Sequence, residues 1–465
     1  MKHIKIIKIL FIALCITSCD LEPVPEAATS ALGFYSNDSE IEAGIINIYD
    51  GIQGVNALEF TSATNWGVQI EFQLTEMFSD NTKTKSGEGV PFEFESFNVD
   101  ATNSSVLDYY RSYFNVIFRA NVVLENLAAA TPANASKFEG EARFLRAYAY
   151  FNLVRLFGDL PFADKVIAPD DLTATYTRVP AAQIYDLIES DLTMAVNSGL
   201  DNSYRTRASK AAAQTLLAKV YLTLGKNYTE AASLCSSVIG SGYTLENNFN
   251  DVFYNENNSE VIFAIGYQAD QPSDSQAFSA EWLNGVGRTS GLNYVTDDAK
   301  AAIDLLGGNR VSTSYREDPG VPGIYQVAKY LPNSTNPQSA GNDWIVLRAA
   351  DVYLLHAEAT MAGSGSTSDG TSVGYFQAVR NRAGLTAAVT VPITTQDLAD
   401  ERRVELAFEN HRWFDLKRLG IASTVLGNFA TANGFSFSGN DLLLPIPNRE
   451  IDLSRGILTQ NAGYN

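Results

Sequence analysis

The chain has 465 residues, with 53 acidic and 33 basic side chains and a formal net charge of −20. This charge argues against a nucleic-acid partner, because phosphates bind to basic surfaces. The length would allow about three domains of roughly 150 residues each, but no Ser/Pro-rich or highly charged linker divides the chain, so we expect one large folded unit over residues 37–465.

The first 18 residues have the pattern of an export signal. Three lysines among the first eight residues are followed by an apolar run that is too short to span a bilayer. The three residues before Cys19, one aliphatic and two small, resemble the lipobox of bacterial lipoproteins, in which the signal is cut before the cysteine and the cysteine receives the lipid. The alternative is an ordinary secretory signal with a coincidental cysteine. Residues 19–36 are expected to form a polar tether, and only Cys235 then remains as a free thiol.

Helical periodicity dominates the next part of the chain. Residues 216–239 resemble a tetratricopeptide repeat with one extra residue in its turn, and the matching positions are Ala218, Tyr221, Gly225, Tyr228 and Ala231. Helical hairpins of this kind cannot bury their apolar faces alone, so we expect them to stack into a superhelical layer. Apolar residues also recur at steps of three and four in four other segments, 39–52, 105–127, 137–157 and 181–200.

Two long segments, 80–105 and 247–343, are rich in Gly, Ser and Asn and are expected to be irregular. Residues 260–267 predict a strand, and the apolar–polar alternation of residues 90–99 predicts a strand of a hairpin. The C-terminal residues 421–465 are also expected to be irregular. Long irregular segments on a rigid scaffold often bind ligands.

Motifs for catalysis, metal binding or cofactor binding are absent from the sequence. After removal of the signal, His356 and His411 are the only histidines, and neither lies at metal-ligand spacing from a second ligand. No phosphate-binding loop or nucleophile elbow occurs, and Cys235 in a predicted helix is expected to be a small core residue. We therefore predict no metal, no cofactor and no enzymatic activity.

The densest charged stretch, residues 401–420, predicts one helix with a stripe of mixed charge between two apolar flanks. Such a helix would be wedged between neighbours, with its charges paired. Glu405 and Glu409 could be offered as the acid pair of a glycoside hydrolase, but the nearby arginines favour the ionised carboxylates and disfavour a general acid.

Five motifs occur in order along the chain: "ARFLRAYAYFNLVRLFGDLPF", "WIVLRAADVYLLHAEA", "AVRNRAGL", "ERRVELAFENHRWFDLKRLG", and "LLPIPNREIDLS" with "TQNAGY". Together they resemble the SusD/RagB family of surface lipoproteins of Bacteroidetes. Small departures occur at Asn410 and His411, where Gly and Gln are common in the family, and at Ala462, where Pro is usual.

The resemblance implies a mostly α-helical fold, a tetratricopeptide-like superhelix that carries a large irregular ligand-binding region with minor β-structure. It places the scaffold in residues 37–79, 106–242 and 344–420. It also implies a non-enzymatic nutrient binder that caps a SusC-like TonB-dependent transporter. The protein would then be lipid-anchored at the extracellular face of the outer membrane, and Asp20 and Glu22 resemble the surface-export signal of these lipoproteins.

The family motifs transfer no ligand-binding residues, so the site must be predicted from chemistry. Sugars pack their CH faces on exposed aromatic rings and need polar side chains for their hydroxyl groups. Trp344 and Trp413 belong to predicted scaffold helices and are expected in the core. The candidate residues in polar, turn-rich segments are Trp282 and Trp66 as platforms, with Arg288, Asn293 and Tyr294 near Trp282.

The predicted ligand is a neutral oligosaccharide, because the negative charge of the protein disfavours polyanionic glycans. For each of Trp66 and Trp282, the alternative to a sugar platform is a cap over the edge of the core. Alternatives for the function are a peptide-binding member of the same family, a periplasmic tetratricopeptide adaptor and a glycoside hydrolase. The long irregular insertion counts against the adaptor, and the lack of an isolated acid pair counts against the hydrolase.

Overall fold

A computed structural model describes residues 34–54, 66–85, 87–256, 258–271, 273–283 and 293–464. The predicted signal, Cys19, Asp20, Glu22 and Arg288 lie outside these residues. The helices are α3 (Asp38–Gln53), α4 (Glu71–Thr75), α5 (Val90–Glu95), α6 (Ser104–Glu125), α7 (Ala135–Phe157), α8 (Leu172–Tyr176), α9 (Ala181–Asn197), α10 (Lys210–Thr223), α11 (Tyr228–Gly240), α12 (Asp251–Tyr254), α13 (Phe278–Glu281), α14 (Asp297–Leu306), α15 (Val311–Ser314), α16 (Ala349–Met361), α17 (Gly370–Arg382), α18 (Thr395–Glu405), α19 (Arg412–Arg418), α20 (Ala422–Ala432) and α21 (Asn448–Leu453).

Strands in the described residues are short and pair antiparallel. They form one four-stranded sheet in the order β1-β5-β7-β6 and three two-stranded pairs, β2 with β3, β4 with β8 and β9 with β10. The strands are β1 (Thr82–Lys83), β2 (Leu160–Pro161), β3 (Arg178–Val179), β4 (Val261–Ile265), β5 (Tyr294–Val295), β6 (Tyr315–Glu317), β7 (Tyr325–Val327), β8 (Trp344–Arg348), β9 (Ser366–Thr367) and β10 (Ile393–Thr394).

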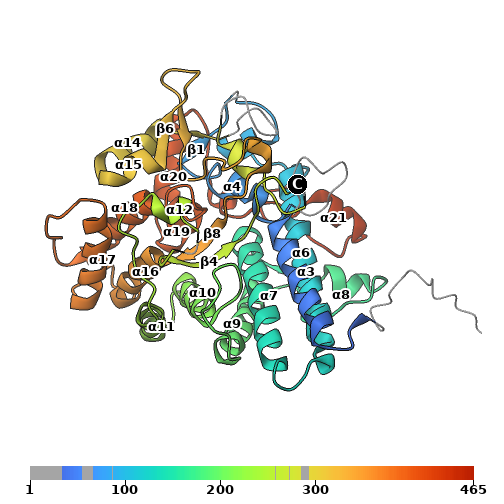
Figure 1. Ribbon diagram of the computed structural model, residues 1–465. Helices are drawn as coiled ribbons and strands as arrows, with labels where there is room; N and C mark the ends of the chain where they lie inside the picture. Colours follow the sequence, from blue (N-terminus) through green and yellow to red (C-terminus); the bar gives the residue numbers. More distant parts are fainter. Residues whose placement is uncertain are drawn as a thin grey trace, which may run out of the picture.

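The long helices form a curved layer of neighbouring hairpins. Figure 1 shows α17, α16, α11, α10, α9 and α7 following one another along the lower part of the molecule. Helix α6 packs on both α3 and α7, and α9 packs on α7 and α10. The periodic segments predicted as helices are confirmed as α3, α6, α7 and α9. Their apolar stripes are buried, as in α3, where Ile41, Ile45, Ile48 and Ile52 have no exposed surface.

The hairpin predicted from the repeat-like stretch is confirmed by α10 and α11. Gly225 in the turn has a φ of 62°, in the left-handed region that favours glycine. Cys235 on α11 is buried, and burial raises the pKa of its thiol, so this cysteine is a core residue as predicted. Helix α11 packs on α16, so the helical layer continues on the other side of residues 247–343 in the sequence.

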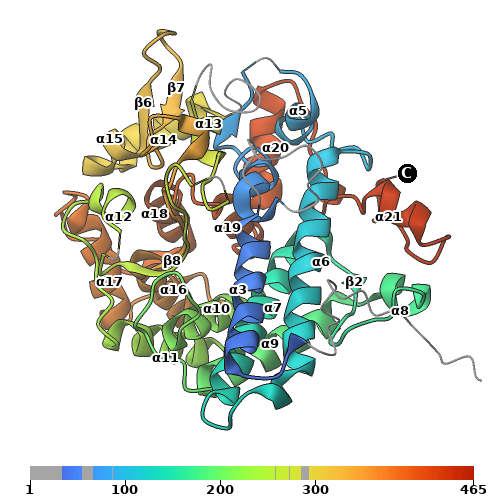
Figure 2. The same ribbon diagram turned by 45° about the vertical axis from the view of Figure 1, so that its right-hand side comes forward.

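The β-sheet and the short helices α14 and α15 lie above this layer (Figure 1), and the β6–β7 hairpin projects from its top (Figure 2). The strand predicted at residues 260–267 is confirmed as β4, and it pairs with β8. Trp344 begins β8, so the expectation that it belongs to a helix is wrong, although it is buried in the core as expected.

The strand predicted at residues 90–99 is also wrong, because this segment begins with α5. Gly89 precedes the helix with a φ of 78°, and Pro91 occupies its first turn, where the missing N–H of proline costs nothing. The alternating phenylalanines therefore lie on a helix, with Phe94 buried and Phe92 partly exposed.

Residues 401–420 form two helices instead of the single helix predicted. Helix α18 ends at Glu405, and α19 begins at Arg412. Phe408 and Asn410 between them have positive φ values of 66° and 60°, which an α-helix cannot contain. Within the described ranges, no helix combines the length and the apolar content that a membrane span requires.

Candidate functional site

Trp282 follows the short helix α13 and is only 1% exposed. Its indole lies between Phe72 and Phe408, with ring centroids 5.3 and 6.4 Å away. The expectation that Trp282 offers an exposed face to a ligand is therefore wrong. Its packing partners lie far away in the sequence, and the polar sequence around the tryptophan did not indicate that they would meet.

Asn293 bonds to Glu281, the residue before Trp282, and both Asn293 and Tyr294 are buried. The backbone N–H of Asn293 donates to the carbonyl oxygen of Glu281, and its side-chain oxygen accepts from the Thr82 hydroxyl at 2.8 Å. Tyr294 belongs to β5, the second strand of the sheet. In this structure the two residues hold the sheet to α13 and present no open face to a ligand.

Trp66 is partly exposed and packs against the edge of the core. Its backbone N–H donates to the Ser112 hydroxyl of α6 at 2.8 Å. Its carbonyl oxygen touches Gly54, where an added Cβ would lie only 2.2 Å away. Trp66 is therefore fixed beside the C-terminal end of α3, and its role in ligand binding stays a prediction.

Glu405, at the end of α18, is the centre of a buried ionic network. Arg348 donates to one of its oxygens at 2.6 Å, Arg310 donates to the other at 2.8 Å, and Arg382 also bonds to it. Although burial alone raises the pKa of this carboxyl, the arginines hold it well below its ordinary value. The prediction that these charges are buried and paired is confirmed.

The network extends through Arg348, which also bonds to Glu260 at 2.7 Å and to Glu409 at 2.7 Å. Lys329 donates to the second oxygen of Glu409 at 2.6 Å. Burial opposes ionisation of Glu409, but Arg348 and Lys329 outweigh it and lower the pKa. A hydrolase needs one carboxyl that stays protonated, and neither Glu405 nor Glu409 meets this requirement.

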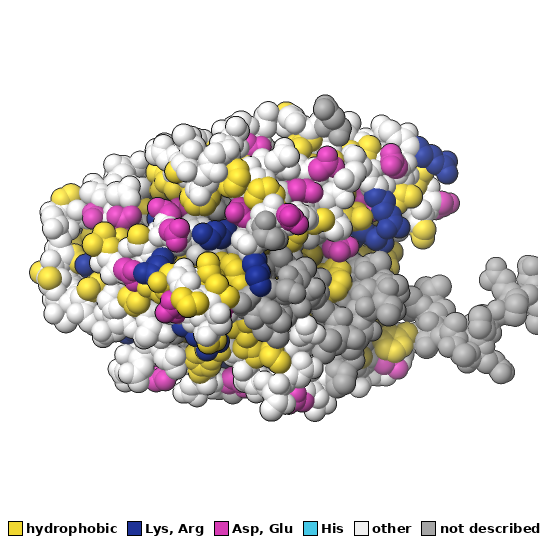
Figure 3. Space-filling model, turned by 90° about the horizontal axis from the view of Figure 1, so that it is seen from above, with side chains coloured by type: hydrophobic (Ala, Val, Ile, Leu, Met, Phe, Trp, Pro, Cys, Tyr) yellow, Lys and Arg dark blue, Asp and Glu magenta, His cyan; other side chains and the backbone are white. Residues whose placement is uncertain are grey.

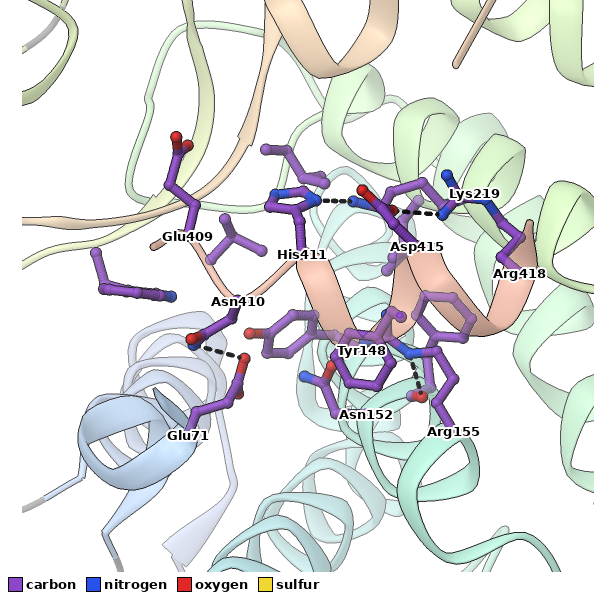
Figure 4. A pocket seen from close by; sticks show the side chains of 16 residues that line it. Glu71, Tyr148, Asn152, Arg155, Lys219, Glu409, Asn410, His411, Asp415 and Arg418 are labelled. Atoms are coloured by element: carbon purple, nitrogen blue, oxygen red, sulfur yellow. Dashed lines mark hydrogen bonds and ion pairs between the residues drawn. The ribbon is translucent and has the colours of Figure 1, made fainter. Parts of the chain in front are cut away.

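A second buried group of polar side chains lies between α7, α10 and α19 (Figure 4). It surrounds a space of about 40 Å³, large enough for water and too small for a sugar ring. Burial is the main cause that lowers the pKa of His411 to about 3, and the Lys219 ammonium 3.4 Å from its Nδ1 adds to the effect. Glu71 accepts from Tyr113 at 2.8 Å. This cluster therefore joins the helices inside the core and is not a site for a sugar.

An open groove of about 760 Å³ lies between α3 and the chain that follows β4. Its volume falls in the range of small-molecule sites, about 300 to 1,000 Å³. Helix α3 contributes Tyr49 and Gln53 to one wall, and the opposite wall contains Tyr267, Asp274 and Asp343. Sequence analysis did not find this groove, because its walls come from segments more than 200 residues apart.

Hydrogen bonds fix the walls of the groove. Gln53 donates to the carbonyl oxygen of Gly266 at 2.9 Å, and Tyr267 donates to the backbone of Gln53 at 2.6 Å. Asp343 accepts from the backbone N–H of Tyr267 at 2.9 Å. Burial raises the pKa of Asp343 to about 7, with further contributions from the acidic residues Glu256 and Asp274.

Ile46, on the rim of the groove, is 56% exposed and adds an apolar surface to these polar groups. The groove thus combines hydroxyl, amide and carboxyl groups with exposed apolar area. Among the described residues, no group of three or more His, Cys, Asp or Glu side chains is placed to hold a metal ion. Figure 3 shows basic side chains scattered among acidic and uncharged ones over the coloured part of the upper face.

Two family models match the chain. The model described as "SusD family" matches residues 316–464, and the model described as "Starch-binding associating with outer membrane" matches residues 37–222. The two ranges do not overlap and together include both ends of the helical layer.

Individual proteins are similar over most of their length. SusD-like protein P2 of Formosa agariphila is 25% identical over all of both chains. The starch-binding protein SusD of Bacteroides thetaiotaomicron is 24% identical over 75% of this chain and 76% of that protein. A solved structure of a laminarin-binding SusD-like protein has a TM-score of 0.77 and 25% identity, and the match covers 92% of this chain and 100% of that one. The predicted superhelical fold is thereby confirmed.

Proposed function

The chain belongs to the SusD/RagB family, and from this premise we propose that it is a cell-surface lipoprotein that binds neutral oligosaccharides and delivers them to a SusC-like TonB-dependent transporter. In this role it acts as the lid of the transporter at the extracellular face of the outer membrane. It captures glycans and performs no chemistry on them.

The observation that carries this proposal is the similarity to the laminarin-binding protein, which extends over 92% of the chain. The relative from Bacteroides thetaiotaomicron is named as a starch-binding protein. Starch and laminarin are both uncharged glucans, so both names support a neutral sugar. The acidic charge of this chain supports it as well, because long-range repulsion lowers the encounter rate with polyanions.

We place the glycan in the groove between α3 and β4, with Trp66 beside the end of α3 as a candidate platform. Sugar hydroxyl groups would bond to groups such as Asp274 and Asp343, and the CH faces of the sugar would pack on apolar surface such as Ile46. Arg288, outside the described residues, remains a candidate contact. Trp282, Asn293 and Tyr294 would act by supporting the sheet.

The test is a glycan array probed with purified protein that starts at residue 20, followed by calorimetric titration of laminarihexaose and the best array hit. Ser273→Trp places a large side chain at the exposed edge of the groove and should weaken binding at least tenfold. Ser233→Trp, on the exposed face of α11, is the matched control and should bind as the wild type does. Equal binding by the two variants counts against the groove, and a peptide as the only ligand counts against the glycan.

The anchor is tested separately. Cys19→Ala should release the full chain from the membrane fraction and leave its melting temperature unchanged, because the tether precedes the folded unit. Fatty-acid labelling of the variant at the wild-type level would place the lipid elsewhere.

The transporter is tested by affinity purification of the tagged protein from membranes in mild detergent. A stable lid should bury roughly 2,000 Å² or more against its partner, so a large β-barrel protein should be recovered with it. Recovery of the lipoprotein alone in several detergents would contradict the lid role.

A further inference from the structure

A pocket of about 300 Å³ lies between α6, α8 and α21. Figure 2 shows α8 and α21 on the far side of α6 from α3, so this pocket is separate from the groove described above. We propose that it is a second sugar-binding site, which holds a single neutral pyranose ring, either free or at the end of an oligosaccharide. The inference rests on the proposed function only for the choice of a sugar as ligand.

Aromatic rings form the walls of the pocket. Tyr110 and Phe114, one turn apart on α6, line it together with Tyr176 at the end of α8. The rings of Tyr110 and Phe114 have centroids 4.7 Å apart, and Tyr110 is held from behind by Phe157 at 5.1 Å. Rigid rings of this kind offer a surface on which the CH face of a pyranose can pack.

Two polar atoms of the pocket wall have no hydrogen-bond partner in the described part of the chain. The hydroxyl oxygen of Tyr110, which is 4% exposed, and the side-chain oxygen of Asn115 are buried and have no hydrogen-bond partner among the described residues. Burying a polar atom without a partner is unfavourable, because its bonds to water are lost and not replaced. Because both residues line the pocket, a bound hydroxyl group can supply these bonds after a small side-chain rotation.

An ion pair without a direct hydrogen bond also lines the pocket. Arg111 Nε and a carboxylate oxygen of Glu450 on α21 are 3.7 Å apart, beyond hydrogen-bond distance, and both side chains are partly exposed. Burial raises the pKa of Glu450, while Arg111 and Arg449 lower it. Vicinal hydroxyl groups of a sugar can accept from the guanidinium and donate to the carboxylate at the same time.

Size and charge select the ligand class. The volume is at the lower limit of small-molecule pockets, so a ring fits better than an extended glycan. One cation and one anion face the pocket, which gives no net preference for a charged ligand. The combination of stacking faces, unpaired polar atoms and a donor–acceptor pair suits a neutral sugar and would be wasted on a purely apolar ligand.

The experiment uses the full chain in mild detergent and four probes, D-glucose, D-galactose, D-mannose and D-xylose. Saturation-transfer NMR should detect at least one of them on the wild type. Thr175→Trp, which fills the pocket from the surface helix α8, and Tyr176→Ala should each weaken that binding at least tenfold, and Asn115→Leu about tenfold. Phe118→Ala is the control, because Phe118 is 50% exposed one turn beyond Phe114 on α6 and does not line the pocket.

Melting temperatures of the variants within a few degrees of the wild type show that the fold is intact, and Tyr176→Phe provides a milder variant if Tyr176→Ala unfolds. Unchanged monosaccharide binding in the pocket variants, or an equal loss in Phe118→Ala, overturns this site and leaves the proposed function standing. Pocket-dependent monosaccharide binding without any array hit supports this site and counts against glycan capture in the groove. No binding in either assay, or binding of phenol but of no sugar, overturns the pocket as a sugar site.

Discussion

Two regions of the molecule contain dense groups of charged side chains, the ionic network around Glu405 and the groove between α3 and β4. In the network, Arg348 bonds to three carboxylates, and none of these side chains is more than 1% exposed. Among the lining residues of the groove, the four acidic side chains Asp50, Glu256, Asp274 and Asp343 outnumber the single cation Arg207, and the walls are open to solvent. The two regions use the same residue types for different purposes.

The difference in burial and pairing between the two regions explains why the same charged residues have different roles. A closed network stabilises one arrangement of the chain, because any change leaves a buried charge without a partner. In an open groove where carboxylates outnumber cations, some acceptor oxygens remain available for hydrogen bonds from a ligand. The predictions below test this contrast in order of the size of the expected effect.

Arg348→Met should have the largest effect on stability. The substitution leaves Glu260, Glu405 and Glu409 buried with fewer cations, and a loss of about 5 kcal/mol is expected in the free energy of unfolding. Chemical denaturation measures this loss. Arg119→Met is the control, because Arg119 pairs with the exposed Asp50 and should cost less than about 1 kcal/mol. Similar losses of unfolding free energy for the two variants would contradict the difference between the buried network and the exposed ion pair.

Trp282→Ala should lower the free energy of unfolding by about 3 to 4 kcal/mol, because it empties a site between Phe72 and Phe408. Trp66→Ala removes a partly exposed ring and should cost clearly less in the same denaturation experiment. In glycan titrations the order reverses, and Trp66→Ala should have the larger effect on affinity if Trp66 is a platform. A stable Trp282→Ala variant that has lost glycan binding would show that this indole contacts the ligand.

Asp343→Asn should change how stability depends on pH. Burial raises the pKa of Asp343 from an unfolded value of about 4 to about 7 in the folded protein. Its stabilising effect is therefore fully present below about pH 4 and is lost as the pH rises through 7. Asparagine keeps the bond from the Tyr267 N–H without this charge, so its advantage over the wild type should grow by about 1 to 3 kcal/mol between pH 5 and 8. An equal difference in the free energy of unfolding between the variant and the wild type at both pH values would contradict the raised pKa.

The salt concentration should have the smallest effect, which is measured on the affinity for the glycan. A neutral glycan in the groove has no charge for salt to screen, so its affinity should change less than about twofold between 50 and 500 mM NaCl. Calorimetry at both concentrations measures this ratio. A strong dependence would identify a charged ligand and contradict the proposal.

The scaffold could be predicted from sequence because its signals are local. The apolar periodicity of α3, α6, α7 and α9 is contained within each segment, and so is the hairpin of α10 and α11. The segment of α5 was predicted wrongly, since alternation over a few residues does not distinguish a strand from a short helix. The break after Glu405 was missed because it depends on positive φ values at Phe408 and Asn410, and neither position is occupied by glycine in this sequence.

The site could not be predicted in the same way, because it depends on which distant segments meet. Trp282 has polar neighbours in the sequence, and its burial comes from Phe72 and Phe408. The groove joins Gln53 to Tyr267, and neither residue type carries a recognisable motif. The charges of α18 were predicted to be paired, but their partner Arg348 lies at the end of a strand and could not be identified from helical spacing.

The contacts between the first and last thirds of the chain also determine when this protein can fold. The backbone N–H of Asn410 donates to Glu76 at 2.7 Å, and Arg412 bonds to Asp80 at 2.8 Å, across more than 330 residues. Closing such long loops is slow, and until it happens Asp80 lacks the cations Arg403 and Arg412 that pair with it in the folded protein. A chain delivered from its N-terminus therefore cannot complete the core around Glu76 and Asp80 until nearly all of it has arrived.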